Sequence, residues 1–516
     1  MLHVTRPSLR AAGAVGVLVA WMVCLGWLGL RQLDRTEATT LSTEAALRLA
    51  PGTVWYALYA GTTQVGNAGN RLDTLSPGYR VSEAVMLETP IGNGLVRVTR
   101  RTEAWLGATL NLERLHSRYS REGRYTEWTA AVFSDTVRAW FTARSLQTHG
   151  SANFAETPTT MAALPYRLGL GGDLVSGRSR TVTLLDGWPP GGRPTMVAVG
   201  RQTVLRFADS SRAGPGEHLV PVHIDSARVF SVVVAGPGGP CRLWVDRRGA
   251  VSGVETPLGV HWVRTDFDLS ETEFRKTLSG RIAAIRAALP PLAQFAASDA
   301  ARDTLTAPRR FLVQHRDGSP VDTALLAMFT GGRQVVRGDT LTVNGGPETA
   351  PGESAGDTVL DPMIQHAGAI ATQQRRMVTE RLDRERLPGF MAAFHRLVRV
   401  DTSAAASDDA LGTLGGHAGR PDGVTRLFVA LLRASGVPAR YVIGIYAHDS
   451  TMLTHAWAEI WSSQAGGWYA VDPVSGRLAA NTGLIRLAFA GSSHPDEMLA
   501  LVANARLIEL GRKEKP

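Results

Sequence analysis

The pattern of apolar and polar positions predicts a long helix at the start of the chain and mainly strands after it. Residues 11–30 contain no charged side chain, and a helix of that length spans about 30 Å, the thickness of the hydrocarbon layer of a membrane. From residue 54 to about residue 268, short alternating runs are separated by turns. In one of them Cys241, Leu243 and Val245 alternate with other residues before Arg247, Arg248 and Gly249 turn the chain.

These patterns predict an α+β fold class, with an N-terminal transmembrane helix, an antiparallel β-rich domain, a small β domain and a C-terminal domain. The predicted segments are a cytoplasmic tail (1–10), a transmembrane helix (11–30), a linker (31–50), the antiparallel β-rich domain (51–269), a helix with a linker (270–307), the small β domain (308–358) and the C-terminal domain (359–516).

The N-terminal apolar run favours an uncleaved membrane anchor. It is longer than the apolar part of a signal peptide, and no small-x-small cleavage site follows it. Arginines flank it equally, with Arg6 and Arg10 before it and Arg31 and Arg35 after it, so the free amino terminus decides the expected orientation. We expect a single-pass membrane protein with a cytoplasmic N-terminus and an extracytoplasmic bulk, either periplasmic or extracellular.

Composition excludes several other classes. The net charge is +9, but only three residues are lysines, the arginines are spread along the chain, and no basic run is interleaved with aromatic residues. We therefore expect no nucleic-acid partner. The only cysteines are Cys24 and Cys241, and Cys24 lies in the apolar run, so neither a disulfide framework nor a cysteine-based zinc site is expected.

Helix signals recur in the second half of the chain. Ser270 and Glu273 have the spacing of a capping box, and the helical pattern after them ends at Pro290. Amphipathic helices are predicted at 363–378 and 386–400. A further apolar stripe at 427–432 predicts a helix that ends near Gly436 and Pro438.

Two predicted strands near the C-terminus carry a histidine and an aspartate. If the strands 454–461 and 467–473 pair so that His455 lies opposite Asp472, Glu459 lies opposite Trp468, and the imidazole meets the carboxylate on one face. The carboxylate then fixes one ring nitrogen and leaves the other available as a base. The residues alone favour ordinary polar surface or a structural hydrogen bond, because a histidine and an aspartate on neighbouring strands are more often one of these than a catalytic pair.

The motifs LLRASGVPAR, THAWAEIW and GGWYAVDP resemble the transglutaminase-like superfamily. The resemblance covers about residues 360–490 and implies a papain-like, cysteine-protease-like core for the C-terminal domain. It implies that His455 is the general base and Asp472 its orienting acid, with Trp457 and Trp468 at the family's aromatic positions in the cleft. The strand-rich part and the anchor in front are similar to bacterial membrane-anchored members.

The nucleophile of that family is absent from the expected place. Seven residues before Phe428, where the family has its cysteine, this chain has Pro421, which we also expect to line the cleft. We expect Cys241 to be a structural strand residue. Asp422 and Thr425 are considered as substitute nucleophiles, although neither occupies the place of the lost thiol. His417 is expected in an exposed loop, because no His-x-x-x-His spacing is present. No metal or cofactor is expected.

The sequence thus predicts a catalytically degenerate transglutaminase-like domain, a pseudoenzyme of the cell envelope whose cleft binds a peptide or protein segment. One alternative is an active protease, amidase or protein cross-linker that uses a nucleophile other than cysteine. Another is a structural envelope protein that acts through its β-rich domain. The sequence also leaves open whether a partner protein supplies a nucleophile.

Overall fold

The computed structural model of the chain describes residues 52–288, 307–345, 354–355, 386–489 and 505–510, apart from short gaps inside these ranges. The gaps are 92–93, 122–123, 144–145, 186–189, 216–217, 237–239, 258, 316–317, 319, 322–325, 327–328, 404–405, 449–450, 464–465 and 479–481.

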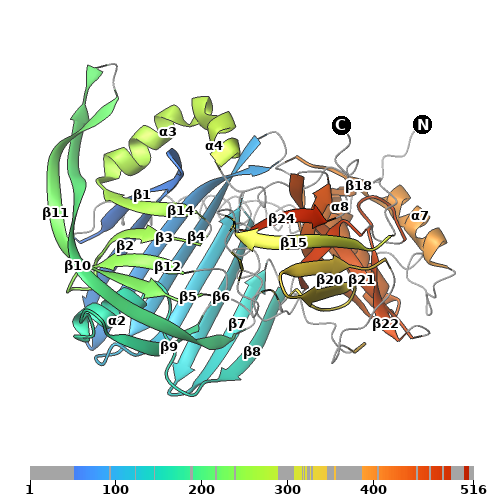
Figure 1. Ribbon diagram of the computed structural model, residues 1–516, viewed down its shortest axis with the longest axis horizontal. Helices are drawn as coiled ribbons and strands as arrows, with labels where there is room; N and C mark the ends of the chain where they lie inside the picture. The colour runs from blue at the N-terminus through green and yellow to red at the C-terminus, as the bar shows by residue number, and fades with distance from the viewer. Residues whose placement is uncertain are drawn as a thin grey trace, which may run out of the picture. The chain divides into compact units, whose positions relative to one another are not determined.

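A fourteen-stranded antiparallel sheet accounts for the N-terminal half of the described chain (Figure 1). Consecutive strands pair as hairpins from β1 to β8 and again from β9 to β14. The first strand pairs with the last, so β1 and β14 lie side by side near the middle of the order, and β8 and β9 form its two ends. The strands are β1 (Val54–Ala60), β2 (Thr63–Leu75), β3 (Gly78–Ile91), β4 (Gly94–Leu106), β5 (Leu112–Arg121), β6 (Arg124–Phe133), β7 (Thr136–Ala143), β8 (Leu146–Asn153), β9 (Ser179–Leu185), β10 (Gly192–Ala213), β11 (Leu219–Val234), β12 (Cys241–Val245), β13 (Val251–Glu255) and β14 (Val260–Thr265).

Alternation along these strands builds the core of the sheet. On β12, Leu243 and Val245 are buried, and they pack in one cluster with residues such as Tyr56 and Val232. The hairpin of β10 and β11 is different. Between residues 201 and 228 most of the described side chains are exposed, and Phe207 is the only buried residue among those described.

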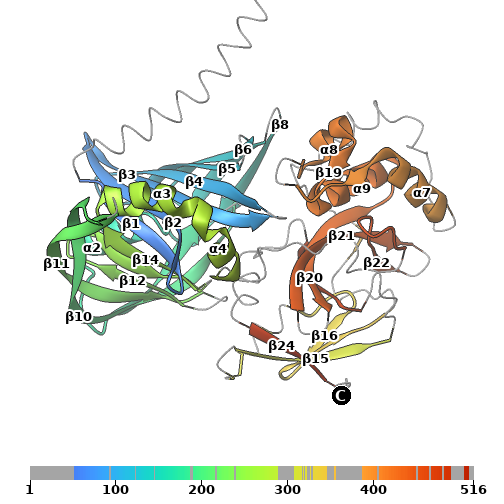
Figure 2. The same ribbon diagram turned by 90° about the horizontal axis from the view of Figure 1, so that it is seen from above.

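Short helices follow β14 and pack on the sheet through Phe274 and Ile285 (Figure 2). They are η2 (Asp268–Thr272), α3 (Glu273–Thr277), η3 (Leu278–Arg281) and α4 (Ile282–Ala288); α2 (Leu164–Leu170) precedes β9. The predicted capping box at Ser270 is wrong. The helical segment begins earlier, because the Asp266 side chain accepts from the Leu269 amide at 2.8 Å, and the Ser270 hydroxyl instead donates to the Phe267 carbonyl.

The described part of the C-terminal half contains two four-stranded antiparallel sheets, a two-stranded parallel sheet and three helices. One four-stranded sheet has the order β22-β21-β20-β23 and the other the order β16-β17-β15-β24. The bounds are β15 (Arg309–His315), β16 (Gln334–Arg337), β17 (Thr340–Val343), α7 (Leu387–Leu397), β18 (Arg399–Val400), α8 (Ala410–Gly416), β19 (Ala418–Gly419), α9 (Pro421–Ala434), β20 (Ala439–His448), β21 (Thr451–Ser462), β22 (Gly467–Val471), β23 (Leu484–Phe489) and β24 (Ala505–Leu510).

The helix α9 is the centre of this half. Its apolar residues are buried, and Phe428 makes edge-to-face ring contacts with Phe390 and Phe394 of α7, as the predicted amphipathic face requires. The helix ends at Ser435, and Gly436 follows with φ 74°, a left-handed conformation that favours glycine. Strand β24 pairs with β15, so residues from segments 308–358 and 359–516 form one sheet.

The predicted α+β class is wrong, because the described chain is mostly β, with one very large antiparallel sheet. Periodicity favoured a large antiparallel sheet or an open barrel for the β-rich domain, but it did not give the order in which the fourteen strands pair. The predicted transmembrane helix at 11–30 lies outside the described residues. Among the residues that are described, no helix is long and apolar enough to cross a membrane.

Candidate functional site

The predicted strand pair exists, but its register differs from the predicted one by two residues. Glu459 lies opposite Ala470 rather than Trp468, and Trp461 lies opposite Trp468. Because side chains alternate between faces with a period of two, an even offset keeps every side chain on its predicted face. His455 and Asp472 therefore still share a face, with the aspartate directly after the end of β22.

His455 and Asp472 are hydrogen-bonded and buried. The imidazole Nε2 donates to the Asp472 Oδ2 at 3.0 Å, and the two residues are 0% and 1% exposed. The same carboxylate accepts from the amides of Val474 and Ser475 and from the Ser475 hydroxyl, the last at 2.6 Å. The aspartate is thus held in one orientation from two directions, which is the arrangement needed to fix the tautomer of the imidazole.

The electrostatics of Asp472 favour its ionised form. Burial alone would raise the pKa of this carboxyl, but the charge and the hydrogen bond of His455, together with the hydrogen bonds of Ser475, outweigh burial and hold the pKa below its usual value. The carboxylate can therefore stabilise a positive charge on the imidazole.

The second ring nitrogen of His455 has no hydrogen-bond partner in the described part of the chain, although it is buried. In a nucleophilic triad this free nitrogen is the one that takes the proton of the attacking group. The nearby hydroxyl of Thr425 is already engaged, because it donates to the carbonyls of Pro421 at 2.8 Å and Ala456 at 3.2 Å. The bond to Ala456 joins α9 to β21 at the residue after His455.

The N-terminus of α9 is built from Pro421 and a buried ion-paired cluster. Pro421 occupies the first turn, where its missing amide hydrogen costs nothing. The carboxylate of Asp422 accepts from Arg420, with distances of 3.3 and 3.1 Å, and from Arg426 at 3.4 Å. Burial would raise the pKa of Asp422, but the neighbouring guanidinium groups hold it below the usual value. Asp422 therefore holds the helix end together, and its carboxylate is occupied.

The predicted cleft-lining residues do not lie on an open surface in this structure. Pro421 is buried, and Trp457 and Trp468 are each 1% exposed. Trp457 packs against Val442, Tyr446 and neighbouring residues. The indole Nε1 atoms of both tryptophans are buried without a hydrogen-bond partner among the described residues.

A buried charge network on the same sheet escaped the sequence analysis. The carboxylate of Glu459 accepts from Arg440 on β20 at 2.8 and 2.6 Å, and from Arg486 on β23 at 3.3 Å. The Arg440 guanidinium also lies over the ring of Trp468, 4.3 Å from its centroid. Burial would raise the pKa of Glu459, but the arginines hold it below the usual value. The sequence does contain a signal for this network, because each of three largely apolar strands carries one charged residue: Arg440, Glu459 and Arg486.

The remaining candidates are separate from this pair. Cys241 lies on β12, and burial, with a smaller effect of Glu255, raises the pKa of its thiol to about 11. His417 is exposed at the end of α8 and donates from Nδ1 to the Leu397 carbonyl at 3.2 Å. Among the described residues, no group of three or more His, Cys, Asp or Glu side chains could hold a metal ion.

No curated protein matches the chain. A solved structure described as a β-barrel-like protein of a domain of unknown function from Brucella abortus is 12% identical, with a TM-score of 0.30, and the match covers 42% of this chain and 97% of that one. A structure titled as a "Putative Cysteine Protease" from Cytophaga hutchinsonii is 15% identical, with a TM-score of 0.22, and the match covers 41% and 89%.

The family comparison is specific to the C-terminal half. Residues 374–473 match the model of the transglutaminase-like superfamily, and both His455 and Asp472 lie within this range. The chain therefore carries a region of the transglutaminase-like superfamily, as its motifs predicted.

Proposed function

We propose that the transglutaminase-like region is a catalytically degenerate module that binds a peptide or protein segment. The observation that supports degeneracy is the state of His455. Its Nε2 is bonded to a fixed carboxylate, whereas its buried Nδ1 has no partner in the described chain. The base and its orienting acid are present, and the group that they would activate is missing from the position that the family uses, where this chain has Pro421.

Neither cysteine of the chain suits thiol chemistry at this site. Cys24 lies in the apolar N-terminal run. The thiolate is the reactive form of cysteine, and the raised pKa of Cys241 leaves very little thiolate at neutral pH. Cys241 is also bound into β12, where it pairs with Val234. Acyl transfer through a thioester is therefore not supported.

The proposed substitutes for the thiol are weak candidates. The Thr425 hydroxyl directs its proton to backbone carbonyls, so it is not oriented to pass that proton to His455. The Asp422 carboxylate is bound by Arg420 and Arg426, which lowers its nucleophilicity. The burial of both side chains is explained by these hydrogen bonds and ion pairs, which stabilise the N-terminal end of α9.

A binding role is supported by three unpartnered nitrogen atoms on one face of the sheet. They belong to His455, Trp457 and Trp468, and each is buried. A buried polar atom without a partner costs about 1–3 kcal/mol, so a donor that reached the Nδ1 of His455, or an acceptor that reached either indole N–H group, would gain that free energy. The carbonyl groups of an extended peptide are suitable acceptors for the two indole N–H groups.

Two assays on the purified full chain test this proposal. In the first, a glutamine-donor peptide is incubated with an amine acceptor, and standard peptide substrates are tested for cleavage; we expect no turnover. Turnover that disappears in His455→Ala would contradict degeneracy and support the enzyme alternative.

In the second assay, a peptide array is probed with the wild-type chain, with His455→Phe and with His417→Phe. We expect a set of peptides that loses binding in His455→Phe and keeps it in His417→Phe, because His417 is exposed and its ring is already bonded to the Leu397 carbonyl. Equal binding by all three proteins, or no binding at all, would overturn the peptide-binding role.

A further inference from the structure

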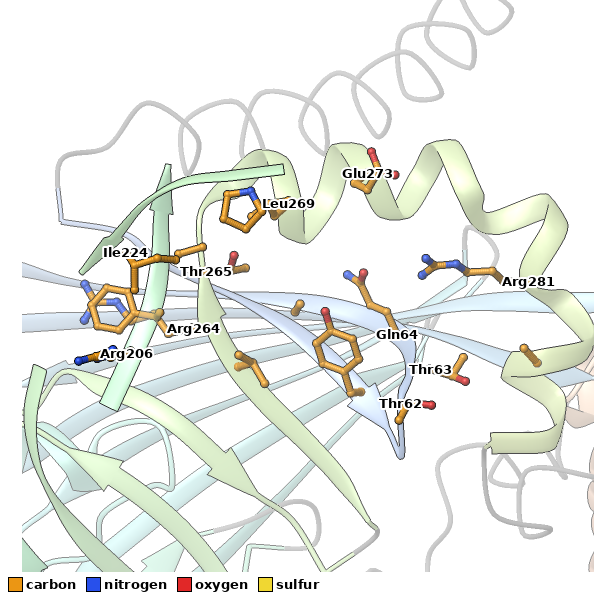
Figure 3. Close-up of a pocket in the computed structure, with 17 residues that line it drawn as sticks. Thr62, Thr63, Gln64, Arg206, Ile224, Arg264, Thr265, Leu269, Glu273 and Arg281 are labelled. Carbon is orange, nitrogen blue, oxygen red and sulfur yellow. The ribbon is translucent and has the colours of Figure 1, made fainter. Parts of the chain in front are cut away.

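Two cavities lie in the large sheet, far along the chain from the transglutaminase-like region. One has a volume of about 700 Å³ and is bounded by β1, β14, the β10–β11 hairpin and the helices after β14 (Figure 3). The other has a volume of about 460 Å³ and is bounded by β10 and by β12 to β14. Four residues line both cavities: Arg206, Phe207, Val263 and Arg264.

The strand register places both cavities on one face of the sheet. Ala57 lies opposite Val263, Val263 opposite Gly253, and Gly253 opposite Trp244, which makes one row across four strands. Opposed residues share a face. Ala57, at one end of this row, lines the larger cavity, and Trp244, at the other end, lines the smaller one. Val263 lies between them and lines both cavities. The two cavities therefore adjoin beneath the β10 segment that carries Phe207.

The larger cavity has an excess of positive charge. Arg206, Arg264 and Arg281 line it, and none of the three forms an ion pair with a residue that the structure describes. Its one acidic residue, Glu273, already accepts from the His218 ring at 2.8 Å and from the Leu219 amide at 3.1 Å. Figure 3 shows Arg206 and Arg264 together at one end, with Arg281 coming from the helical side. Arginine suits carboxylate and phosphate groups, because its planar fork donates two parallel hydrogen bonds.

The junction between the cavities joins this charge to an apolar surface. The Arg264 guanidinium lies over the Phe207 ring at 3.9 Å from its centroid, and Val263 is 41% exposed beside it. A guanidinium stacked in this way keeps its edge free for an anion.

The smaller cavity is mainly apolar. Its apolar lining includes Leu205, Phe207, Trp244 and Val263, and Glu255 and His261 line it on the same face as Gly253. The lining also includes Ser252, whose hydroxyl is buried without a hydrogen-bond partner in the described chain. The apolar part of this lining is suited to an alkyl chain.

We propose that the two cavities form one binding site for an anionic amphiphile with a single alkyl chain. The anionic head binds Arg206 and Arg264 at the junction and in the larger cavity, and the alkyl chain occupies the Trp244 side. The head group is a carboxylate, as in a free fatty acid, or a phosphate, as in a single-chain lipid. Both have the chemistry that the arginines recognise. Neither His455 nor Asp472 lines this site, so a test of the site does not test the function proposed above.

Titration calorimetry on the purified full chain tests the site. The probes are dodecanoate, dodecyl phosphate, neutral dodecanol and inorganic phosphate, each below its micelle concentration or solubility limit. We expect saturable binding of an anionic dodecyl compound, at least tenfold tighter than binding of dodecanol or inorganic phosphate, and weakening as salt is raised. Tighter binding of dodecanoate identifies a fatty acid, and tighter binding of dodecyl phosphate identifies a lipid phosphate.

Matched variants separate this site from general adsorption. Arg206→Glu is compared with Arg212→Glu, which makes the same charge change at another exposed arginine of β10 outside both linings. Val263→Asp is compared with Val204→Asp, an exposed valine outside both linings. We expect at least tenfold weaker binding for Arg206→Glu and Val263→Asp and less than a twofold change for the controls.

Several outcomes would overturn the site. If dodecanol bound as tightly as the anionic dodecyl compounds, the arginines would not contribute to binding. If inorganic phosphate bound as tightly as those compounds, the apolar cavity would not contribute. Equal losses in a variant and its control would show adsorption elsewhere on the chain, and the absence of saturable binding would exclude the site. Circular dichroism of each variant confirms that it is folded before binding is compared.

Discussion

His455 and Asp472 are hydrogen-bonded at 3.0 Å although they are not opposite each other in the strand ladder. The observed register continues from Ala458 opposite Val471, so the position opposite Asp472 belongs to Trp457. The histidine is its diagonal neighbour on the same face, within reach of a long side chain. The carboxylate lies just beyond β22, where Ser475 and the Val474 amide hold it toward the histidine.

We predict that Asp472→Ala destabilises the region around β21. The substitution leaves the buried Nε2 of His455 without its acceptor, and such a loss costs about 1–3 kcal/mol. Hydrogen exchange of peptides from β21, followed by mass spectrometry, reports the local opening free energy. Asp209→Ala is the control, because Asp209 is exposed on β10 and we expect no change in β21. Unchanged exchange in Asp472→Ala would show that this hydrogen bond contributes nothing to stability.

A larger effect is expected at Glu459. Glu459→Gln leaves the buried guanidinium of Arg440 without a compensating charge, and breaking one partner of a buried ion pair costs about 3–5 kcal/mol. Glu255→Gln removes the partner of Arg242 in an exposed pair, for which the expected cost is about 0–1 kcal/mol. Thermal unfolding followed by circular dichroism compares the two variants. Equal shifts in melting temperature would contradict the importance of the buried network.

The pH dependence of stability follows from the same carboxylates. The pKa of Glu459 is held below its usual value in the folded chain, so the unfolded chain takes up a proton first as the pH falls. Its stabilising contribution is complete above the ordinary glutamate pKa of about 4.3 and is lost as the pH falls through the lower folded-state pKa. We expect Glu459→Gln to show a shallower loss of protection in β21 below about pH 4.5. Parallel pH profiles of the variant and the wild type would exclude this linkage.

The sequence was most informative where its pattern was local. The strand carrying His455, the helix over Leu427–Leu432 and the left-handed Gly436 were predictable, because periodicity and glycine chemistry act over a few residues. The face shared by His455 and Asp472 was also predictable, because face depends only on parity. The residues that lie directly opposite each other in β21 and β22 were not predictable, because the register depends on the short turn after Ser462 and on packing against neighbouring strands.

Long-range features could not be read in the same way. Nothing local indicates that β1 pairs with β14, about 200 residues later, and this pairing joins the hairpins into one sheet. The burial of Trp457 and Trp468 also depends on residues distant in sequence, and so does the meeting of Arg440 and Arg486 at Glu459. The membrane anchor, its orientation and the extracytoplasmic location stay predictions, because residues 1–51 lie outside the described chain.

Restoring a thiol tests the degeneracy of the site. In Pro421→Cys, the new side chain stands in the first turn of α9, where the positive end of the helix dipole favours a thiolate. We expect iodoacetamide to label this thiol at pH 6–7 much faster than Cys241, and His455→Ala to slow the labelling at least tenfold. Labelling that does not depend on His455 would show that Pro421 does not occupy the position of the missing nucleophile.

The packing beside the pair allows a last prediction, at Gly444. A Cβ atom on Gly444 would lie 2.2 Å from the Ile485 carbonyl oxygen and 2.4 Å from the Trp457 ring, closer than real contacts allow. Gly444→Ala therefore forces β20 away from β23 or displaces the tryptophan, at a cost of about 1–3 kcal/mol. Gly415→Ala in α8 is the control, because its Cβ meets open space and alanine favours helix, so we expect no loss of stability. The measurement is thermal unfolding together with hydrogen exchange of β20. An unchanged melting temperature and unchanged hydrogen exchange of β20 in Gly444→Ala would show that Trp457 is not packed against this strand. The packing described here for the face that carries His455 would then be wrong.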